Sequence, residues 1–390
     1  MAQSRPGSGV TAARGFRASG VAAGLKSSGL LDVALVVNDG PRNVGAGVFT
    51  ANRVKAAPVL WTQQVVQDGR VDAVVLNSGG ANACTGPEGF QDTHATAEWA
   101  AMALKVSAGD VAVCSTGLIG ERLPVDRLLA GVDEAVDQLS PEGADEAARA
   151  IMTTDSVPKQ AAAAGSGFVV GGMAKGAGML APGLATMLAV LTTDADVDRD
   201  VLDLALRGAT ARTFDRVDSD GCMSTNDTVL LLASGASGVT PTGPELATVV
   251  EAVCADLARQ LVDDAEGSSK TVAVTVRRAR TEADALTVAR AVARSNLLKC
   301  AIHGEDPNWG RVLAAVGTTD AAFEPGHLAV ALGGVWVCRD GMAAEDRALV
   351  DLSGRQVTIT VDLGAGDDEV TVWTNDLTAA YVHENSAYAT

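Results

Sequence analysis

One segment near the middle of the chain places a hydroxyl group where it could attack its own backbone. From Lys175 to Asp194 the sequence reads KGAGMLAPGLATMLAVLTTD, in which a glycine-rich approach leads into the strongly apolar run Met187–Leu191. Thr186 stands at the junction, next to Ala185. Attack of the Thr186 hydroxyl on the Ala185 carbonyl gives an ester, and hydrolysis of that ester cuts the chain and leaves Thr186 with a free α-amine. The plainer interpretation is a threonine that simply opens a buried strand.

A threonine with a free α-amine carries a nucleophile and its base in one residue. The ordinary pKa of an α-amine is about 8, so the amine can accept the hydroxyl proton at neutral pH. The glycines before Thr186 fit this chemistry, because the loop must bend to bring the oxygen onto the carbonyl. Such acyl chemistry needs a nucleophile, a base and a site that stabilises the oxyanion. It requires no metal and no organic cofactor.

The elements around this junction are predicted to alternate between strands and helices. Short apolar runs that end in Asn or Ser are typical of interior strands, and amphipathic runs with helical spacing lie between them. The expected strands are 32–38, 71–77, 110–115, 228–233 and 271–277. The expected helices are 90–106, 124–139, 144–152, 197–213, 245–264 and 283–296. From residue 311 onward mainly strands are expected, so the pattern predicts an α/β (α+β) layered sandwich whose halves meet near residue 185.

Composition excludes several classes of partner. The chain has 390 residues, 47% of them hydrophobic, which is enough for a sizeable core. Its net charge of -18 argues against nucleic acid and against anionic membranes. The stretch 176–193 is free of charge, but its glycines and proline favour a buried segment of a soluble fold over a membrane span.

Cysteine and histidine usage points to an intracellular protein without a metal site. The cysteines form no CxxC pair, so we expect reduced, mostly buried thiols in the cytoplasm. The four histidines have no metal-ligand spacing. The glycine-rich stretch 165–176 matches neither a dinucleotide-binding nor a phosphate-loop pattern, and it is expected to form tight turns only.

Taken together, these motifs resemble the ornithine acetyltransferases of arginine biosynthesis, also called glutamate N-acetyltransferases. The cleavage motif of that family reads much like MAKGxGMxAPxxATMLAxxTTDA, and residues 173–195 match it closely. Further blocks follow in the order of the family and cover essentially the whole chain. They are GFRASGVAAGLK (15–26), GVFTANRVKAAPV (47–59), NSGGANACTG (77–86), CSTGLIGERLP (114–124), IMTTD (151–155), STNDT (224–228), GEDPNWGR (304–311) and YVHENSAYAT (381–390).

The resemblance implies catalytic roles for three residues. Thr186 matches the nucleophile that cleavage after Ala185 exposes, and Thr116 and Gly117 match the pair that forms the oxyanion hole. A hydroxyl and a backbone N–H in a turn of small residues can indeed point at a developing oxyanion, and one such donor is typically worth about 3 kcal/mol of barrier. By itself, an STG sequence would indicate only a strand-to-helix turn.

The resemblance also implies a set of substrate-binding residues. Lys175 could hold a substrate carboxylate, or favour the unprotonated amine of Thr186 through charge repulsion. Glu266 could face the ammonium group of ornithine, and its plainer interpretation is a charge at a helix end. The matching positions are Thr153 (preferred over Thr154), Lys175, Thr186, Glu266, Asn385 and Thr390. The last two imply that the C-terminus docks at the site.

The resemblance further implies how the protein is assembled and how it works. Residues 1–185 would form an α chain and residues 186–390 a β chain, which share one αββα-type sandwich and pair into an α2β2 heterotetramer. The acetyl group would pass from N-acetylornithine to Thr186 and then to glutamate in a ping-pong reaction without metal or cofactor. The sequence leaves open whether acetyl-CoA also serves as a donor.

Three alternatives stay open at this point. A paralogous acetyltransferase of a specialised pathway, such as clavulanic acid biosynthesis, would share the fold and the acetyl exchange. A self-processing aminopeptidase of similar architecture would also expose a nucleophile, but it would release amino acids. A non-catalytic binding protein would keep the fold without the cleavage.

Overall fold

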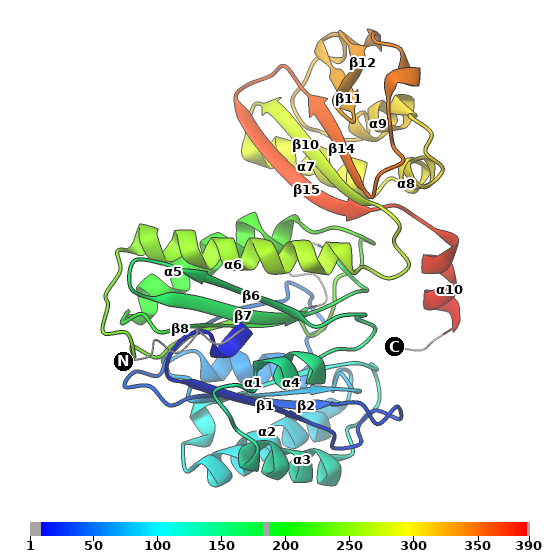
Figure 1. The fold of residues 1–390 in the computed structure, drawn as a ribbon. Helices are drawn as coiled ribbons and strands as arrows, with labels where there is room; N and C mark the ends of the chain where they lie inside the picture. The colour runs from blue at the N-terminus through cyan, green and yellow to red at the C-terminus, as the bar shows by residue number, and fades with distance from the viewer. Residues whose placement is uncertain (1–8, 182–186, 388–390) are drawn as a thin grey trace.

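Four layers, helix–sheet–sheet–helix, make up the larger part of the molecule in the computed structural model (Figure 1). The structure describes residues 9–181 and 187–387, so Ala185, Thr186 and Thr390 lie outside the described residues. The expected α/β layered sandwich is confirmed. No helix among the described residues is long and apolar enough to cross a membrane.

Sheet A forms the lower sheet of the sandwich in Figure 1. Its strand order is β1-β2-β4-β5, with β4 and β5 parallel and the other pairs antiparallel. Its outer face packs against two helices, and successive residues of β2 point to opposite faces, as a strand requires. The elements are β1 (Phe16–Val21), β2 (Val33–Asn38), β4 (Ala73–Ser78), β5 (Val111–Thr116), α2 (Gly86–Leu104) and α3 (Val125–Asp137).

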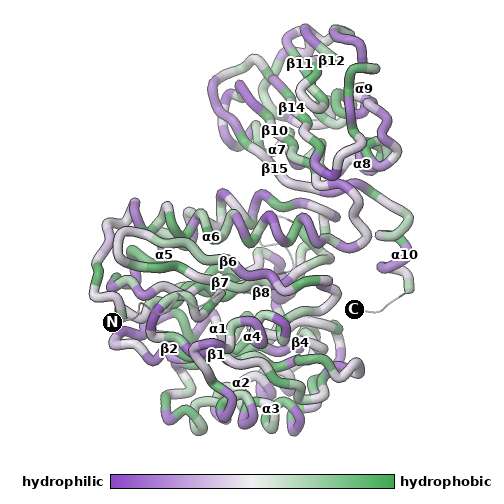
Figure 2. The backbone as a smooth tube through the Cα atoms, viewed as in Figure 1, coloured by the Kyte–Doolittle hydropathy of each residue, from purple (hydrophilic) through white to green (hydrophobic). Residues whose placement is uncertain are grey.

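Sheet B has the strand order β3-β9-β8-β7-β6 and is covered on its outer face by α5 and α6. Figure 2 shows hydrophilic and hydrophobic stretches alternating along α6, as expected of an amphipathic helix on a sheet. The strand β8 lies in the middle of the sheet and is buried throughout, which explains the charge-free stretch seen in the sequence. The elements are β3 (Val44–Phe49), β6 (Lys159–Ala164), β7 (Val169–Lys175), β8 (Leu188–Thr193), β9 (Thr228–Ala233), α5 (Arg199–Arg212) and α6 (Gly243–Asp263).

Two short helices complete the sandwich. α4 (Ala144–Ala150) contributes its alanines to the core shared by the two sheets. α1 (Ala57–Val65) packs against β5. Small residues let α4 approach β1 so closely that an added Cβ at Gly20 would lie 2.1 Å from the carbonyl oxygen of Glu146. The sandwich therefore depends on glycine and alanine at this contact.

Residues 271–375 form a third sheet with its own hydrophobic core, a separate unit that the sequence analysis did not predict. Its strand order is β13-β12-β11-β14-β10-β15, and helices α7, α8 and α9 cover it. The last helix, α10 (Ala379–Ala387), leaves this unit and runs toward the sandwich (Figure 1). The elements are β10 (Thr271–Ala279), α7 (Glu282–Ala293), α8 (Asn296–His303), α9 (Trp309–Val316), β11 (Ala329–Leu332), β12 (Val335–Arg339), β13 (Met342–Ala343), β14 (Gln356–Asp362) and β15 (Asp368–Asn375).

The expectation of mostly buried cysteines is wrong. The thiols of Cys114, Cys254 and Cys338 are buried, whereas Cys84, Cys222 and Cys300 are exposed. Cys84 and Cys222 lie in loops, and Cys300 lies on the exposed side of α8. At these positions the side chain does not pack into a hydrophobic core.

The close contact between β1 and α4 gives a first prediction. Replacing Gly20 with Ala should lower the free energy of unfolding by about 1–3 kcal/mol, because the new methyl group must displace the α4 backbone. Urea unfolding measures this difference. Gly326→Ala is the matched control, since nothing lies within 4 Å of an added Cβ there. Equal stability of both variants with the wild type would contradict the packing described here.

Candidate active site

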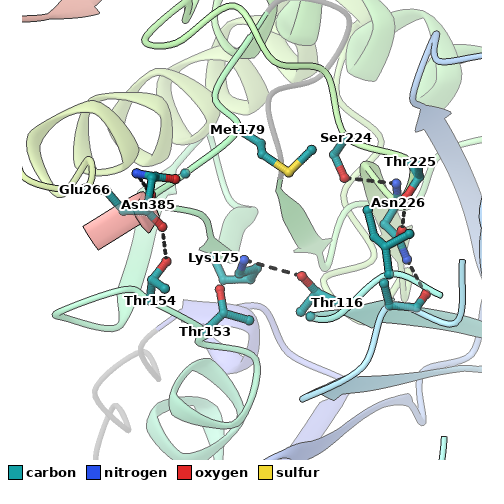
Figure 3. Close-up of a pocket in the computed structure, with 14 residues that line it drawn as sticks. Thr116, Thr153, Thr154, Lys175, Met179, Ser224, Thr225, Asn226, Glu266 and Asn385 are labelled. Carbon is teal, nitrogen blue, oxygen red and sulfur yellow. Dashed lines mark hydrogen bonds between the residues drawn. The ribbon is translucent and has the colours of Figure 1, made fainter. Parts of the chain in front are cut away.

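A pocket opens where β5 of sheet A and β7 of sheet B end (Figure 3). Six residues predicted from the sequence line it, although up to 269 positions separate them along the chain (116 to 385): Thr116, Gly117, Thr153, Lys175, Glu266 and Asn385. The structure thus brings together all the predicted site residues that it describes. Their individual roles remain predictions. The other lining residues are Ala81, Ile119, Thr154, Gly178, Met179, Ser224, Thr225 and Asn226.

The predicted oxyanion turn begins at the last residue of β5, Thr116. Gly117 follows with φ of +129°, a conformation that favours glycine. An added Cβ at Gly117 would lie 2.5 Å from the backbone nitrogen of Gly80. That nitrogen donates a hydrogen bond of 3.0 Å to the Thr116 carbonyl oxygen. The turn is therefore held against the end of the neighbouring strand β4, in a shape that only glycine at position 117 permits.

Lys175 is the last residue of β7, and its side chain is only 2% exposed. Its Nζ lies 3.4 Å from the Thr116 hydroxyl, a contact drawn in Figure 3, and 4.0 Å from Asp155 Oδ2. Burial lowers the pKa of Lys175, and the charge of Asp155 partly opposes that shift. The ammonium group therefore loses its proton more readily than an exposed lysine does.

Asp155 is the buried counter-charge of this region. Its carboxylate accepts hydrogen bonds from Lys159 Nζ at 2.7 Å, from the Gly176 backbone nitrogen at 2.6 Å and from the Thr153 backbone nitrogen at 2.9 Å. Burial alone would raise the pKa of Asp155, but the charges of Lys175 and Lys159 outweigh it and lower the pKa to about 2. The carboxylate is therefore ionised at any pH at which the protein works.

Glu266 forms a second polar cluster on the far side of Lys175 (Figure 3). Its carboxylate accepts hydrogen bonds from the Thr154 hydroxyl at 2.7 Å and from Asn385 Nδ2 at 3.0 Å. The Glu266 backbone nitrogen donates to Ala177 O at 2.9 Å, which ties this cluster to the loop after β7. Asn385 belongs to α10, so the C-terminal helix reaches the pocket as the sequence implied.

The two candidate threonines occupy different positions. Thr154 binds Glu266, whereas Thr153 lies beside Lys175 and is held through its backbone by Asp155 (Figure 3). Both line the pocket. The preference for Thr153 stays a prediction.

Sequence reasoning assigned no role to the segment Ser224–Asn226, which forms one wall of the pocket. This segment belongs to the block STNDT, which was noted only as part of the family pattern. The Asn226 side chain donates hydrogen bonds to Ser115 of β5 and to Ala81 in the loop after β4, and both partners are more than 100 positions away in the sequence. No local periodicity reports such a contact.

Comparison with known proteins shows close relatives. A match to the ArgJ family covers residues 17–390. The arginine biosynthesis bifunctional protein ArgJ of Streptomyces avermitilis is 68% identical over 380 residues, which is 97% of this chain and 99% of that protein. The protein of the same name from Mycobacterium tuberculosis is 59% identical over 389 residues, covering 98% and 96% of the two chains.

Two solved structures are also similar in sequence. One is described as ornithine acetyltransferase complexed with ornithine from Mycobacterium tuberculosis; it is 60% identical, covers 46% of this chain and 96% of that chain, and has a TM-score of 0.42. The other, the arginine biosynthesis bifunctional protein ArgJ from Bacillus halodurans, is 34% identical, with coverage of 50% and 97% and a TM-score of 0.47.

The buried charge cluster gives a second prediction. Asp155→Asn should lower the free energy of unfolding at pH 7 by about 3–5 kcal/mol, because it removes the carboxylate beside buried Lys175 and leaves buried Lys159 paired with Asp264 alone. The folded-state pKa of about 2 lies below the ordinary 3.8, so the contribution is present above pH 4 and is lost as the pH falls from 3.8 to 2. Urea unfolding of both proteins between pH 7 and pH 3 measures this, and the gap between them should narrow at the acidic end.

The control for this prediction is Asp203→Asn. Among the residues that the structure describes, Asp203 pairs only with Arg207, on the exposed side of α5, so its loss should cost less than about 1 kcal/mol. Similar losses for both variants would show that Asp155 is not a buried counter-charge.

Proposed function

The chain belongs to the ArgJ family, and from that premise we propose that the pocket at the ends of β5 and β7 is the active site of an acetyltransferase of arginine biosynthesis. The enzyme moves the acetyl group of N-acetylornithine to glutamate and releases ornithine and N-acetylglutamate. One observation carries the proposal: side chains from distant parts of the chain that match the family's site converge on this single pocket.

We place the nucleophile at Thr186. Lys175 lines the pocket and is paired with Leu188 across the β7–β8 ladder, and Thr186 precedes Leu188 by two positions in the sequence. After cleavage between Ala185 and Thr186, the new α-amine takes the hydroxyl proton, and the oxygen adds to the acetyl carbonyl carbon of N-acetylornithine. The C–N bond then breaks, ornithine leaves with the proton on its amine, and acetyl-Thr186 remains.

The second half of the reaction reverses these steps with a different amine. The α-amine of glutamate attacks the acetyl ester, the C–O bond breaks, and the proton returns to the Thr186 oxygen. In both halves the Thr116 hydroxyl and the Gly117 N–H would stabilise the oxyanion, and the strained turn that holds them supports this role. Lys175 would bind the substrate carboxylate, and Glu266 the ammonium group of ornithine.

This chemistry uses no metal ion and no organic cofactor, since the nucleophile, its base and the oxyanion donors are all protein groups. Because the relatives are named bifunctional, we infer that the second activity uses acetyl-CoA to acetylate glutamate through the same Thr186 ester.

We further propose that the fragments 1–185 and 186–390 stay together as an α2β2 heterotetramer in the cytoplasm. The aminopeptidase, binding-protein and specialised-pathway alternatives are not favoured, because the relatives at 59–68% identity are named for arginine biosynthesis.

Intact mass under denaturing conditions tests the cleavage. The wild type should give two fragments, residues 1–185 and 186–390, whereas Thr186→Ala should give one chain of 390 residues. Thr192→Val is the control and should be cleaved normally, because the buried Thr192 hydroxyl binds Val10 O at the other end of β8. A wild-type chain that stays intact would remove the free amine on which the mechanism depends.

Incubation with a single substrate tests the transferase step. With N-acetylornithine alone, fragment 186–390 should become one acetyl group heavier while one equivalent of ornithine is released. Addition of glutamate should return the fragment to its original mass and yield N-acetylglutamate. Glu266→Gln should weaken binding of N-acetylornithine more than binding of acetyl-CoA, since only the former carries an ammonium group for Glu266. Release of free amino acids from peptides, without acetylation of the fragment, would instead indicate an aminopeptidase.

A further inference from the structure

Two adjacent polar residues, Asn226 and Asp227, cross between the two sheets at the active site. They come directly before β9, which belongs to sheet B, and both side chains are almost fully buried, at 5% and 0% exposure. Buried polar side chains are costly unless each polar atom has a partner. The partners of Asn226 belong to the side of sheet A, whereas Asp227 Oδ1 binds Met187, directly before β8 of sheet B; Asp227 Oδ2 has no hydrogen-bond partner among the described residues.

Asn226 holds the oxyanion turn of sheet A. Its Nδ2 donates two hydrogen bonds, to Ala81 O at 2.6 Å and to Ser115 O at 2.8 Å. Ser115 directly precedes Thr116, and Ala81 follows Gly80, whose nitrogen binds the Thr116 carbonyl. A single amide group therefore joins both backbone segments that shape the turn.

Asp227 holds the start of β8 in sheet B. Its Oδ1 accepts a hydrogen bond of 3.2 Å from the backbone nitrogen of Met187, the residue that follows Thr186. The next residue, Thr228, donates its backbone N–H to Met187 O at 3.1 Å, so both the backbone N–H and the carbonyl oxygen of Met187 are hydrogen-bonded. Burial raises the pKa of Asp227 well above its ordinary value, which favours a neutral carboxyl over a charged base.

We propose that Asn226 and Asp227 act together as positioning residues of the acetyl transfer, holding the oxyanion turn of sheet A in register with the first residues of β8 in sheet B. The inference rests on the proposed function of Thr186. Because the two residues are neighbours in one short backbone segment, that segment connects the contacts of Asn226 with those of Asp227. Acyl transfer depends on the placement of the nucleophile relative to the oxyanion donors, and this segment links the oxyanion turn to Met187, which follows the proposed nucleophile in the sequence.

The residue types suit the task. The Asn226 amide offers two N–H groups from one nitrogen, which match two carbonyl oxygens, and its Oδ1 accepts from the Thr225 hydroxyl at 2.6 Å. The Asp227 carboxyl offers an acceptor to a backbone N–H inside a fully buried site. An asparagine at position 227 would preserve this acceptor, whereas an aspartate at position 226 would place oxygen opposite two carbonyl oxygens.

Steady-state kinetics of cleaved enzyme, with N-acetylornithine and glutamate, test the proposal. We expect Asn226→Ala and Asp227→Ala each to reduce kcat at least tenfold, with KM for both substrates changed less than threefold, since neither residue is expected to bind the leaving or accepting amino acid. Asn226→Asp should lose at least as much as Asn226→Ala. Asp227→Asn should retain at least a third of the wild-type kcat. The double alanine variant should lose little more than the worse single variant, because residues that act as one unit are not additive.

Intact mass and thermal unfolding accompany each assay. Rates are expressed per cleaved chain, and Thr192→Val serves as the control for losing one buried hydrogen bond in the same sheet. The proposal would be overturned if the alanine variants lost only as much stability as the control and kept the wild-type kcat. It would also be overturned if Asp227→Asn were inactive, because the Asp227 carboxylate would then act as a base. If the alanine variants fail to fold, the isosteric pair Asn226→Asp and Asp227→Asn decides between these outcomes. A wild type without acetyl transfer would instead refute the proposed function itself.

Discussion

The carboxylate of Asp155 binds three parts of the molecule at once: the Lys159 ammonium, the Gly176 backbone and the Thr153 backbone. It also lies 4.0 Å from the Lys175 ammonium. Without it, two cations would be buried in sheet B with too little counter-charge, which proteins do not tolerate well. Through these contacts Asp155 holds the segment at Thr153, the end of β7 and the start of the loop that leads toward the proposed cleavage position.

The two sheets then supply complementary halves of the site. Sheet A ends β5 at Thr116, where the turn at Gly117 would present the proposed oxyanion donors, and sheet B ends β7 at Lys175. The Lys175 side chain bridges the halves through its contact with the Thr116 hydroxyl. Sites built on strands hold their side chains more precisely than sites on loops, which suits a reaction whose rate depends on fixed distances.

Local sequence patterns predicted the strongest elements but not the contacts between them. The apolar run 228–233 was predicted with its observed bounds. The strands β3, β6 and β7 were missed because VGAGVF, KQAAAA and VVGGMAK each contain at least three glycine or alanine residues, which are depleted in strands. The separate C-terminal unit is defined by its own core, a tertiary property without a local signal. In the site, the family resemblance predicted Thr116, Lys175 and Glu266. It did not predict the role of the Asn226 amide, because its contact with Ser115 exists only once the fold has brought β5 next to the start of β9.

The strand order also explains how the two fragments of a chain cleaved at its active site could remain associated in one folded protein. The proposed cleavage lies in the connection between β7 and β8, which are hydrogen-bonded neighbours from Val170–Thr193 to Lys175–Leu188. A second pairing across the fragments joins β3 to β9 over its whole length. Both fragments also bury residues in the core between the sheets. Cleavage would therefore break one peptide bond in a connection and none of the ladders, so the strands that carry Thr116 and Lys175 would keep their pairing.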